Sequence, residues 1–104
     1  MRSCIVIPAY QPENILVSYV RKLLESKVGP VLVVDDGSRA DCQPIFDQLA
    51  GMEDCIVLHH PVNRGKGAAL KTAIHWYRTH PGDYEGCSGI VTADCDGQHA
   101  VEDV

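Results

Sequence analysis

Two carboxylates separated by one residue stand near the end of the chain, at Asp94 and Asp96. In an extended or turning segment both can point to one side, and they resist ionising together unless a cation shares their charge. Oxygen ligands favour a hard ion such as Mg²⁺ or Mn²⁺, and Gln98 is near enough in the chain to add a ligand. An Asp-Gly turn that closes a strand would explain the same residues, so both interpretations stay open.

A second acidic pair, Asp35 and Asp36, follows an apolar run and precedes Gly37 and Ser38. A carboxylate there can accept a hydrogen bond from a base N–H or a ribose hydroxyl, as an acidic residue after a strand does in dinucleotide-binding folds. The same residues also make a good turn with a helix N-cap candidate, and taken alone the turn is the simpler interpretation.

Glycines punctuate residues 63–69, which we expect to open a helix. Its unpaired N–H groups, its dipole and two cations, Arg64 and Lys66, would suit an anion, while Gly65 and Gly67 permit close backbone approach. The segment does not match the P-loop pattern, and no G-x-G-x-x-G follows the first apolar run. A capped helix with two solvated cations is the alternative.

Aromatic and imidazole side chains give weaker indications of a binding site. Tyr10 follows Pro8 and Ala9 at the end of the first apolar run, where its ring could stack on a base or pack against the protein. The histidines at positions 59, 60, 75 and 80 show no spacing typical of a metal site, so we expect them at the surface or in structural roles.

The elements that must position these residues alternate along the chain. Four short apolar runs, at residues 4–7, 31–34, 55–58 and 89–93, predict strands buried on both faces. Helical spacing predicts helices over residues 14–28, from an N-cap at Asp41 with Pro44 in the first turn, and over residues 65–80. This order predicts an α/β fold with a mostly parallel sheet, in which ligands bind outside the carboxyl ends of the strands. All four polar clusters fall at those ends.

The composition fits one globular domain over residues 1–104. Hydrophobic residues make up 45% of the chain, and 14 acidic against 9 basic residues give a formal net charge of −5, which argues against nucleic acid as a partner. No apolar run approaches the roughly 20 residues that span a bilayer. Five cysteines without a Cys-x-x-Cys pair fit neither a disulfide framework nor a zinc site. We therefore expect buried thiols, as at Cys4, Cys55 and Cys95, in a cytoplasmic protein.

Four motifs occur in a fixed order: Ile7-Pro8-Ala9-Tyr10, Val34-Asp35-Asp36-Gly37-Ser38, Asn63-Arg64-Gly65-Lys66-Gly67-Ala68-Ala69-Leu70 and Thr92-Ala93-Asp94-Cys95-Asp96-Gly97-Gln98-His99. Together they resemble the amino-terminal half of glycosyltransferase family 2, in particular its dolichol-phosphate mannosyltransferase-like branch. Each motif is weak by itself, but four in this order are specific and cover essentially the whole chain. The resemblance implies a truncated Rossmann-like, three-layer nucleotide-diphospho-sugar transferase fold of the glycosyltransferase A type.

The resemblance also implies metal-dependent, inverting transfer of a sugar from a UDP- or GDP-sugar to a lipid-phosphate acceptor, such as polyprenyl phosphate, or to a cell-envelope glycan. It places Asp94, Asp96 and Gln98 at a Mg²⁺ or Mn²⁺ ion, and it places Asp36, or Asp35 beside it, at the base. The nucleotide sugar as a whole would contact Pro8, Ala9, Tyr10, Asp35, Asp36, Gly65, Lys66, Gly67 and Asp94. A divalent ion would offset the carboxylates and the pyrophosphate and stabilise the leaving group.

Two departures from the family pattern matter. Gln11-Pro12-Glu13 shifts the family's acidic residue by one position, which puts Glu13 in doubt as a nucleotide contact. The family's catalytic base and acceptor-binding residues follow the metal motif, so we expect the base beyond Val104, and residues 100–104 read as the opening of another helix.

From these departures we expect an inactive donor-binding fragment of a longer protein that is associated with the cytoplasmic face of a membrane. Uncovered helix faces and sheet edges would favour a homo-oligomer.

Two other functions stay open on the residues alone. A buried strand that ends in Asp-x-Asp-Gly also resembles haloacid-dehalogenase-type phosphatases, in which the first Asp is the nucleophile and Mg²⁺ binds both carboxylates. That family places the motif on its first strand, whereas here it comes last. A non-catalytic nucleotide-binding module would carry the same donor-binding motifs.

Overall fold

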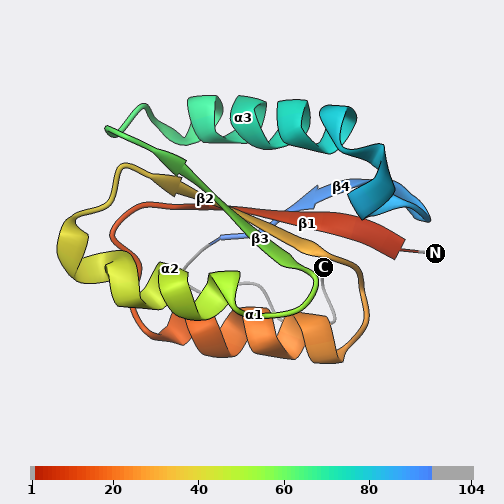
Figure 1. The fold of residues 1–104 in the computed structure, drawn as a ribbon, viewed down its shortest axis with the longest axis horizontal. Helices are drawn as coiled ribbons and strands as arrows, with labels where there is room; N and C mark the ends of the chain where they lie inside the picture. The colour runs from red at the N-terminus through yellow and green to blue at the C-terminus, as the bar shows by residue number, and fades with distance from the viewer. Residues whose placement is uncertain (1, 95–104) are drawn as a thin grey trace.

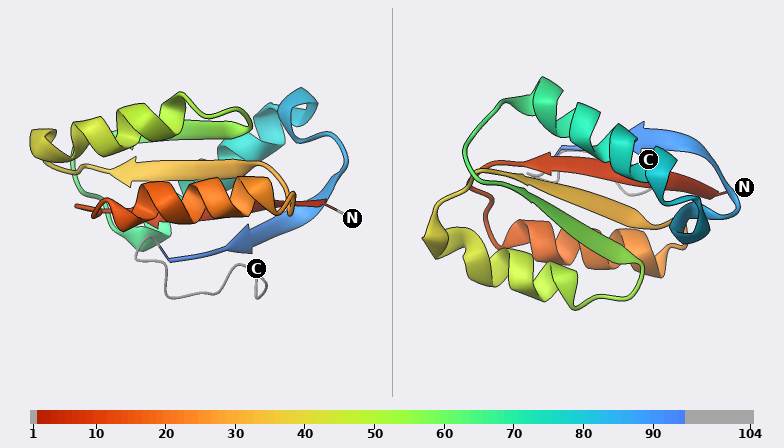
Figure 2. Two further views of the ribbon diagram at one scale, coloured as in Figure 1. Left: turned by 90° about the horizontal axis from the view of Figure 1, so that it is seen from below. Right: turned by 45° about the horizontal axis from the view of Figure 1, so that its top comes forward.

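The computed structural model describes residues 2–94 and has three layers (Figure 1). Its strands form one parallel sheet in the order β3-β2-β1-β4, namely β1 (Arg2–Ala9), β2 (Val31–Asp36), β3 (Cys55–His60) and β4 (Cys87–Thr92). Helices α1 (Ile15–Glu25) and α2 (Gln43–Ala50) lie side by side on one face, and α3 (Lys66–Thr79) covers the other (Figure 2). Short 3-10 turns, Ala40–Cys42 and Pro81–Tyr84, precede α2 and β4. The expected α/β fold with a parallel sheet is confirmed.

Both faces of the sheet are buried at its two central strands, β1 and β2, as expected. The expectation is wrong for the outer strands: β3 is mostly half-buried, and no residue of β4 is buried, because each has a neighbouring strand on one side only. Successive side chains of a strand point to opposite faces. Ile5 and Ile7 of β1 therefore pack in the cluster under α1 and α2. Cys4 and Val6, one position along, pack in the cluster under α3.

Small residues on the inner face of α3 let that helix lie close to the sheet. Ala69 and Ala73 are fully buried, and Trp76 and Tyr77 pack against the same cluster. No helix within residues 2–94 is long and apolar enough to cross a membrane.

The expectation of buried thiols is confirmed at Cys4 and Cys55. Burial, assisted at Cys4 by the neighbouring Cys87, raises the pKa of both thiols to about 12. These two side chains are therefore unreactive parts of the core. Cys95 lies outside the described residues.

Several bounds differ from the sequence-based expectations: β1 and β4 each begin two residues earlier, at Arg2 and Cys87, and α1 ends at Glu25. β2 and β3 each run two residues further, to Asp36 and His60, because the polar side chains at their ends pair with each other. Asp41 is not an N-cap: it lies in the 3-10 turn before α2, and Cys42 precedes that helix without a side-chain cap. Pro44 lies in the first turn as expected.

The path of the chain creates a crevice at one edge of the sheet. From β1 to β3 it moves outward through α1 and α2 on one face, and it then crosses the other face through α3 to return on the far side of β1 as β4. β1 and β4 are thus neighbours at the point where the strand order reverses: the connection that leaves β1 crosses one face of the sheet, and the connection that enters β4 crosses the other. In open α/β sheets, ligands bind at the carboxyl ends of such a pair of strands.

Candidate functional site

A pocket of about 430 Å³ lies where this crevice is expected. Its lining comes from the ends of β1, β2 and β4 and from the start of α3: Pro8, Ala9, Tyr10, Asp36, Asn63, Gly65, Lys66 and Asp94. Tyr10 is 51% exposed, so its ring is an accessible wall of the pocket rather than core packing. The fold therefore brings residues of all four motifs together in one pocket.

Asp36 is buried beside the pocket, and its carboxylate accepts four hydrogen bonds. Oδ1 accepts from His60 Nδ1 over 2.8 Å and from the N–H of Arg64 over 2.9 Å. Oδ2 accepts from the N–H of Gly65 over 2.8 Å and from Asn63 Nδ2 over 3.2 Å. A carboxylate has about four lone-pair positions, so these donors use its full capacity. Asp36 thereby fixes the loop 63–65 against the end of β2.

The same donors keep Asp36 ionised. Burial by itself would raise the pKa, but hydrogen bonds from His60 and from the backbone of Arg64 and Gly65 outweigh it and hold the pKa below its ordinary value. On its other side His60 Nε2 lies 2.8 Å from Thr72 Oγ1. Because a carboxylate can only accept, Nδ1 carries the hydrogen that His60 donates to Asp36. A buried chain of hydrogen bonds thus joins β2, β3 and α3.

Asp35 points to the opposite face of the sheet. Its Oδ2 lies 2.8 Å from His59 Nδ1, and its Oδ1 accepts from the N–H of Ser38 over 2.9 Å. Ser38 Oγ in turn accepts from the N–H of Gln11 over 2.9 Å. Asp35 therefore shapes the turn after β2 and ties it to the residue that follows Tyr10.

Gly37 lets two loops of the site touch. Its φ is +73°, and a Cβ at this position would lie 2.2 Å from backbone atoms of Val62 and Asn63. No other residue type fits both the conformation and the space. The Asp-Gly turn is therefore part of the support for the loop that precedes α3.

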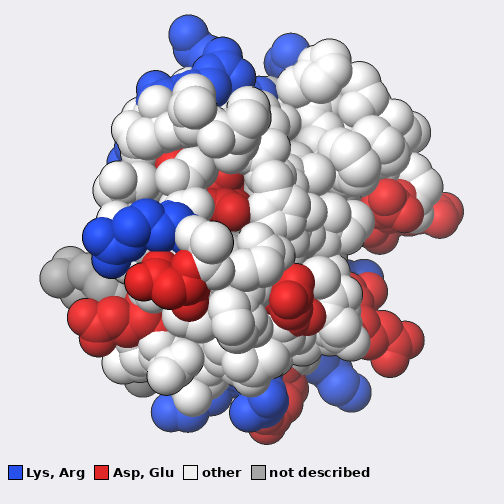
Figure 3. All heavy atoms as spheres, turned by 60° about the vertical axis from the view of Figure 1, so that its left-hand side comes forward, with Lys and Arg blue, Asp and Glu red and all other residues white. Residues whose placement is uncertain are grey.

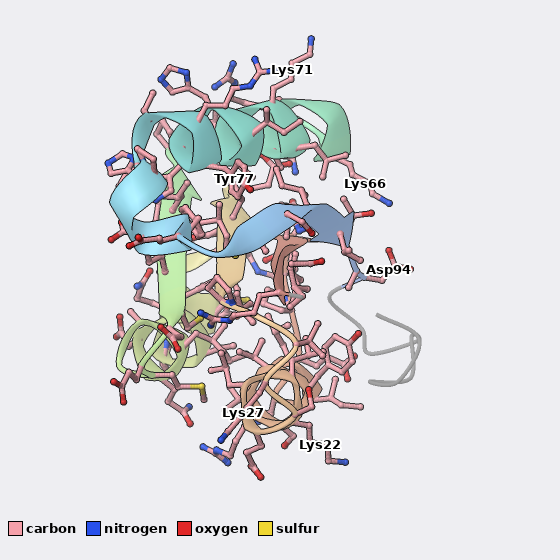
Figure 4. The ribbon with its side chains drawn as sticks, turned by 90° about the vertical axis from the view of Figure 1, so that its right-hand side faces the viewer. Lys22, Lys27, Lys66, Lys71, Tyr77 and Asp94 are labelled. Atoms are coloured by element: carbon pink, nitrogen blue, oxygen red, sulfur yellow. The ribbon has the colours of Figure 1, made fainter. Side chains whose placement is uncertain are left out.

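The start of α3 presents cationic and N–H groups to the pocket. Gly65, at φ +96°, redirects the chain into the helix, and its carbonyl accepts from Ala69. The N–H groups of residues 66–68 have no acceptor within the helix, so this end suits an anion. Lys66 Nζ lies 3.6 Å from Asp94 Oδ1 beyond the end of β4 (Figure 4). Their side chains are 66% and 39% exposed, so this ion pair is weak and can rearrange around a ligand.

Most of the residues predicted to bind a nucleotide sugar meet in the pocket, and two do not. Asp35 lies on the α1 and α2 face, and Gly67 borders a separate hollow on the outer side of α3. The two further metal-ligand predictions, Asp96 and Gln98, lie outside the described residues. The expectation of a catalytic base beyond Val104 stays a prediction.

Two residues that the sequence analysis did not assign to the site take part in it. Asn63 lines the pocket, and His60 holds Asp36. A signal for the histidine exists: β2 ends in two aspartates and β3 in two histidines, and the sheet pairs them in register, Asp35 with His59 and Asp36 with His60. Matching the polar ends of neighbouring strands would have found it.

The described residues fit a hard divalent cation in part. Asp94 offers an oxygen ligand at the pocket, whereas the oxygens of Asp36 are occupied by four donors. Within residues 2–94 no group of three or more His, Cys, Asp or Glu could enclose a metal. An ion held by Asp94 would take its remaining ligands from residues after 94 and from a bound diphosphate, which is how Mg²⁺ commonly binds.

Comparison with known proteins gives a family match over nearly the whole chain. Residues 4–104 match the model of glycosyl transferase family 2. An uncharacterized protein of Methanocaldococcus jannaschii is 33% identical over 100 residues, covering 96% of this chain and 37% of that protein.

Two relatives have named activities. The UDP-N-acetylglucosamine–dolichyl-phosphate N-acetylglucosaminyltransferase of Methanococcus voltae is 29% identical over 114 residues, covering 96% of this chain and 43% of that protein. The polyprenol monophosphomannose synthase of Mycolicibacterium smegmatis is 32% identical over 106 residues, covering 99% and 38%. The chain thus spans about two fifths of the length of these relatives.

Proposed function

The chain belongs to glycosyl transferase family 2, and from this membership we propose that its pocket binds the nucleoside-diphosphate sugar donor of a transfer to a lipid-phosphate acceptor. The observation that carries the proposal is the meeting of Tyr10, Lys66 and Asp94 in one pocket at the β1–β4 crevice. An aromatic ring, a cation at a helix start and a carboxylate match the base, the diphosphate and a bridging metal ion of such a donor.

Each group of residues has a distinct task in this proposal. Tyr10 stacks on the base, with Pro8 and Ala9 forming the adjoining wall. Lys66 and the N–H groups at the start of α3 face the diphosphate. Asp36 lines the pocket and supports its wall, since its hydrogen bonds hold the loop that contains Asn63 and Gly65.

Asp94 would hold a Mg²⁺ or Mn²⁺ ion together with Asp96 and Gln98 from the following segment. The ion, when bound, would offset the charge that develops on the departing nucleoside diphosphate. This assignment rests on the carboxylate of Asp94 at the pocket and on the order of the acidic residues in the sequence.

The acceptor is proposed from the relatives, two of which are named for dolichyl phosphate or polyprenol. In an inverting transfer the acceptor oxygen forms a bond to the anomeric carbon while the bond to the diphosphate oxygen breaks. A hydroxyl acceptor needs a base for its proton, whereas an acceptor phosphate can itself be the nucleophile. We expect the 104-residue chain to bind the donor without transferring its sugar.

Isothermal titration calorimetry tests the donor site. UDP-N-acetylglucosamine and GDP-mannose are titrated with Mn²⁺, with Mg²⁺ and with EDTA, and we expect at least one donor to bind in a metal-dependent way. Asp94→Ala should remove the dependence on metal. Asp83→Ala is the matched control. Asp83 is an exposed carboxylate in the turn before β4, so it lies near the amino end of that strand, whereas the pocket lies at the carboxyl ends.

Binding that needs no metal and is unchanged in Asp94→Ala would overturn the proposal. Hydrolysis of a generic phosphate ester that disappears in Asp94→Asn would instead favour the phosphatase alternative, in which this Asp is the nucleophile.

A further inference from the structure

One segment of this acidic chain contains basic residues and no acidic ones. Residues 55–82 contain Arg64, Lys66, Lys71 and Arg78 and no Asp or Glu, whereas the other residues hold all 14 acidic and only five basic side chains. The segment consists of β3, α3 and the loop between them. The protein therefore has a strong local positive charge that its net charge of −5 conceals.

Helical geometry gathers this charge on the face of α3 that points away from the sheet. Lys71, Ile74, His75 and Arg78 follow at three- and four-residue spacing, opposite the buried Ala69 and Ala73. All four are exposed. Figure 4 shows Lys71 pointing away from the sheet. In Figure 3, blue lies along the top of the molecule, where α3 lies, and blue and red are mixed below it. We call these four residues and Arg64, just before the helix, the α3 outer face.

Nothing in the described part of the chain neutralises these cations. Of the basic residues in segment 55–82, only Lys66 has an ion pair within residues 2–94, and it faces the pocket instead. Arg64, Lys71 and His75 also border a hollow of about 480 Å³ with Thr72 on its floor. Lys71 and Arg78 are seven residues apart, about two helical turns, and Arg64 precedes the helix, so one anionic surface along this face could attract all three cations.

The α3 outer face combines its cations with an aliphatic side chain. Ile74 is 41% exposed and lies on the helix between Lys71 and Arg78, one turn from each. Basic side chains are attracted to the anionic headgroups of a lipid surface, and an exposed aliphatic side chain among them can contact the apolar boundary beneath. The phosphates of a nucleic acid could pair with the cations, but they would make no apolar contact with Ile74.

We propose that the α3 outer face docks on an anionic lipid surface. A flat surface meets this face alone, and α1 and α2 lie beyond the sheet on the far side of a molecule that measures 36 × 27 × 22 Å. Electrostatic interactions are screened over about 8 Å at physiological salt, so the acidic residues on that side contribute little repulsion. The proposal does not rest on donor binding.

Vesicle co-sedimentation of the 104-residue chain tests the proposal. We expect binding to vesicles of equal parts phosphatidylglycerol and phosphatidylcholine, weakening as salt rises, and none to phosphatidylcholine alone. Each basic residue near such a surface contributes about a fivefold change in partitioning, so Lys71→Glu with Arg78→Glu should lower it by at least about 20-fold.

The matched control is Lys22→Glu with Lys27→Glu, which makes the same change in charge at exposed positions on the opposite side of the molecule (Figure 4). This variant should bind the anionic vesicles no worse than does the parent. An equal loss in both double variants would show a response to net charge alone and overturn the proposal. So would the absence of binding by the parent, or full binding by Lys71→Glu with Arg78→Glu.

Two further measurements distinguish contact with lipid from a general attraction to polyanions. Ile74→Ser should weaken vesicle binding without a change in charge, and equal binding of the parent and Ile74→Ser would contradict the lipid contact. Binding of soluble polyglutamate or RNA as tight as that of the vesicles would also contradict it. Circular dichroism confirms that each variant is folded. The donor titration, repeated on Lys71→Glu with Arg78→Glu, should be unchanged, so failure of either proposal can be recognised independently.

Discussion

The carboxylate of Asp36 and the imidazole of His60 meet at 2.8 Å across neighbouring strands, and both side chains are buried. Asp36 also accepts from the backbone of Arg64 and Gly65, and His60 is held by Thr72. The pair is thus the point at which β2, β3 and the start of α3 are joined. A substitution at either residue should first disturb the conformation of the pocket wall.

Asp36→Ala should destabilise the protein by roughly 3 kcal/mol, because it leaves buried donors of His60, Arg64 and Gly65 without an acceptor. Urea denaturation followed by circular dichroism measures this. Asp47→Ala removes an exposed carboxylate on α2 that accepts only from Gln43, and it should cost less than about 0.5 kcal/mol. Equal effects of the two substitutions would contradict the role of the buried network.

Asp36 should position the pocket wall rather than read the base, since all its acceptor positions are occupied within the protein. Asp36→Asn should therefore weaken binding of UDP- and GDP-sugars by the same factor, as measured by calorimetry. A loss confined to one base would show direct contact between the carboxylate and that base.

Acid should remove the contribution of Asp36 to stability. Because the folded state holds its pKa below the ordinary value, this contribution is complete above the unfolded pKa of about 3.9 and is lost as the pH falls through the lower folded pKa. The difference in unfolding free energy between the parent and Asp36→Asn should shrink across that acid range. A difference that stays constant down to about pH 2 would contradict the lowered pKa.

The alternation of the fold was predictable because four apolar runs and their intervening helical patterns are strong signals. Which of the two aspartates at the end of β2 faces the pocket could not be predicted. Asp35 and Asp36 end a strand buried on both faces, so no alternation of polar and apolar residues marks a side. The assignment depends on α3 crossing the face opposite α1 and α2, which is a property of the whole topology.

The pocket lining was predictable for a related reason. Parallel strands end at one edge, so polar residues such as Tyr10 and Asp94 that follow different strands must lie near one another. The exclusion of Gly67 could not be foreseen, because a one-residue step along a helix turns a group by about 100° and the direction of α3 was unknown.

Gly37→Ala should destabilise the protein by at least about 2 kcal/mol, because a Cβ would clash with the backbone of Val62 and Asn63 in addition to straining a positive φ. Gly86→Ala is the matched control. Its φ of +87° imposes a similar strain, but no atom lies within 4 Å of the added Cβ, so it should cost only about 1 kcal/mol. Thermal unfolding compares the stability of the two variants. Equal losses of stability would mean that backbone strain, and not the clash with Val62 and Asn63, accounts for the effect of Gly37→Ala.

Lys66 should matter for the ligand and hardly at all for the fold. Its ion pair with Asp94 is long and exposed, so Lys66→Ala should change the unfolding free energy by less than about 0.5 kcal/mol. The same substitution should weaken donor binding about tenfold, since a charge-assisted hydrogen bond to the diphosphate is lost. Lys71→Ala removes a cation from the outer side of the same helix and should leave donor affinity unchanged. An equal loss of affinity in both variants would mean that the overall positive charge of α3, and not a direct contact with Lys66, attracts the diphosphate.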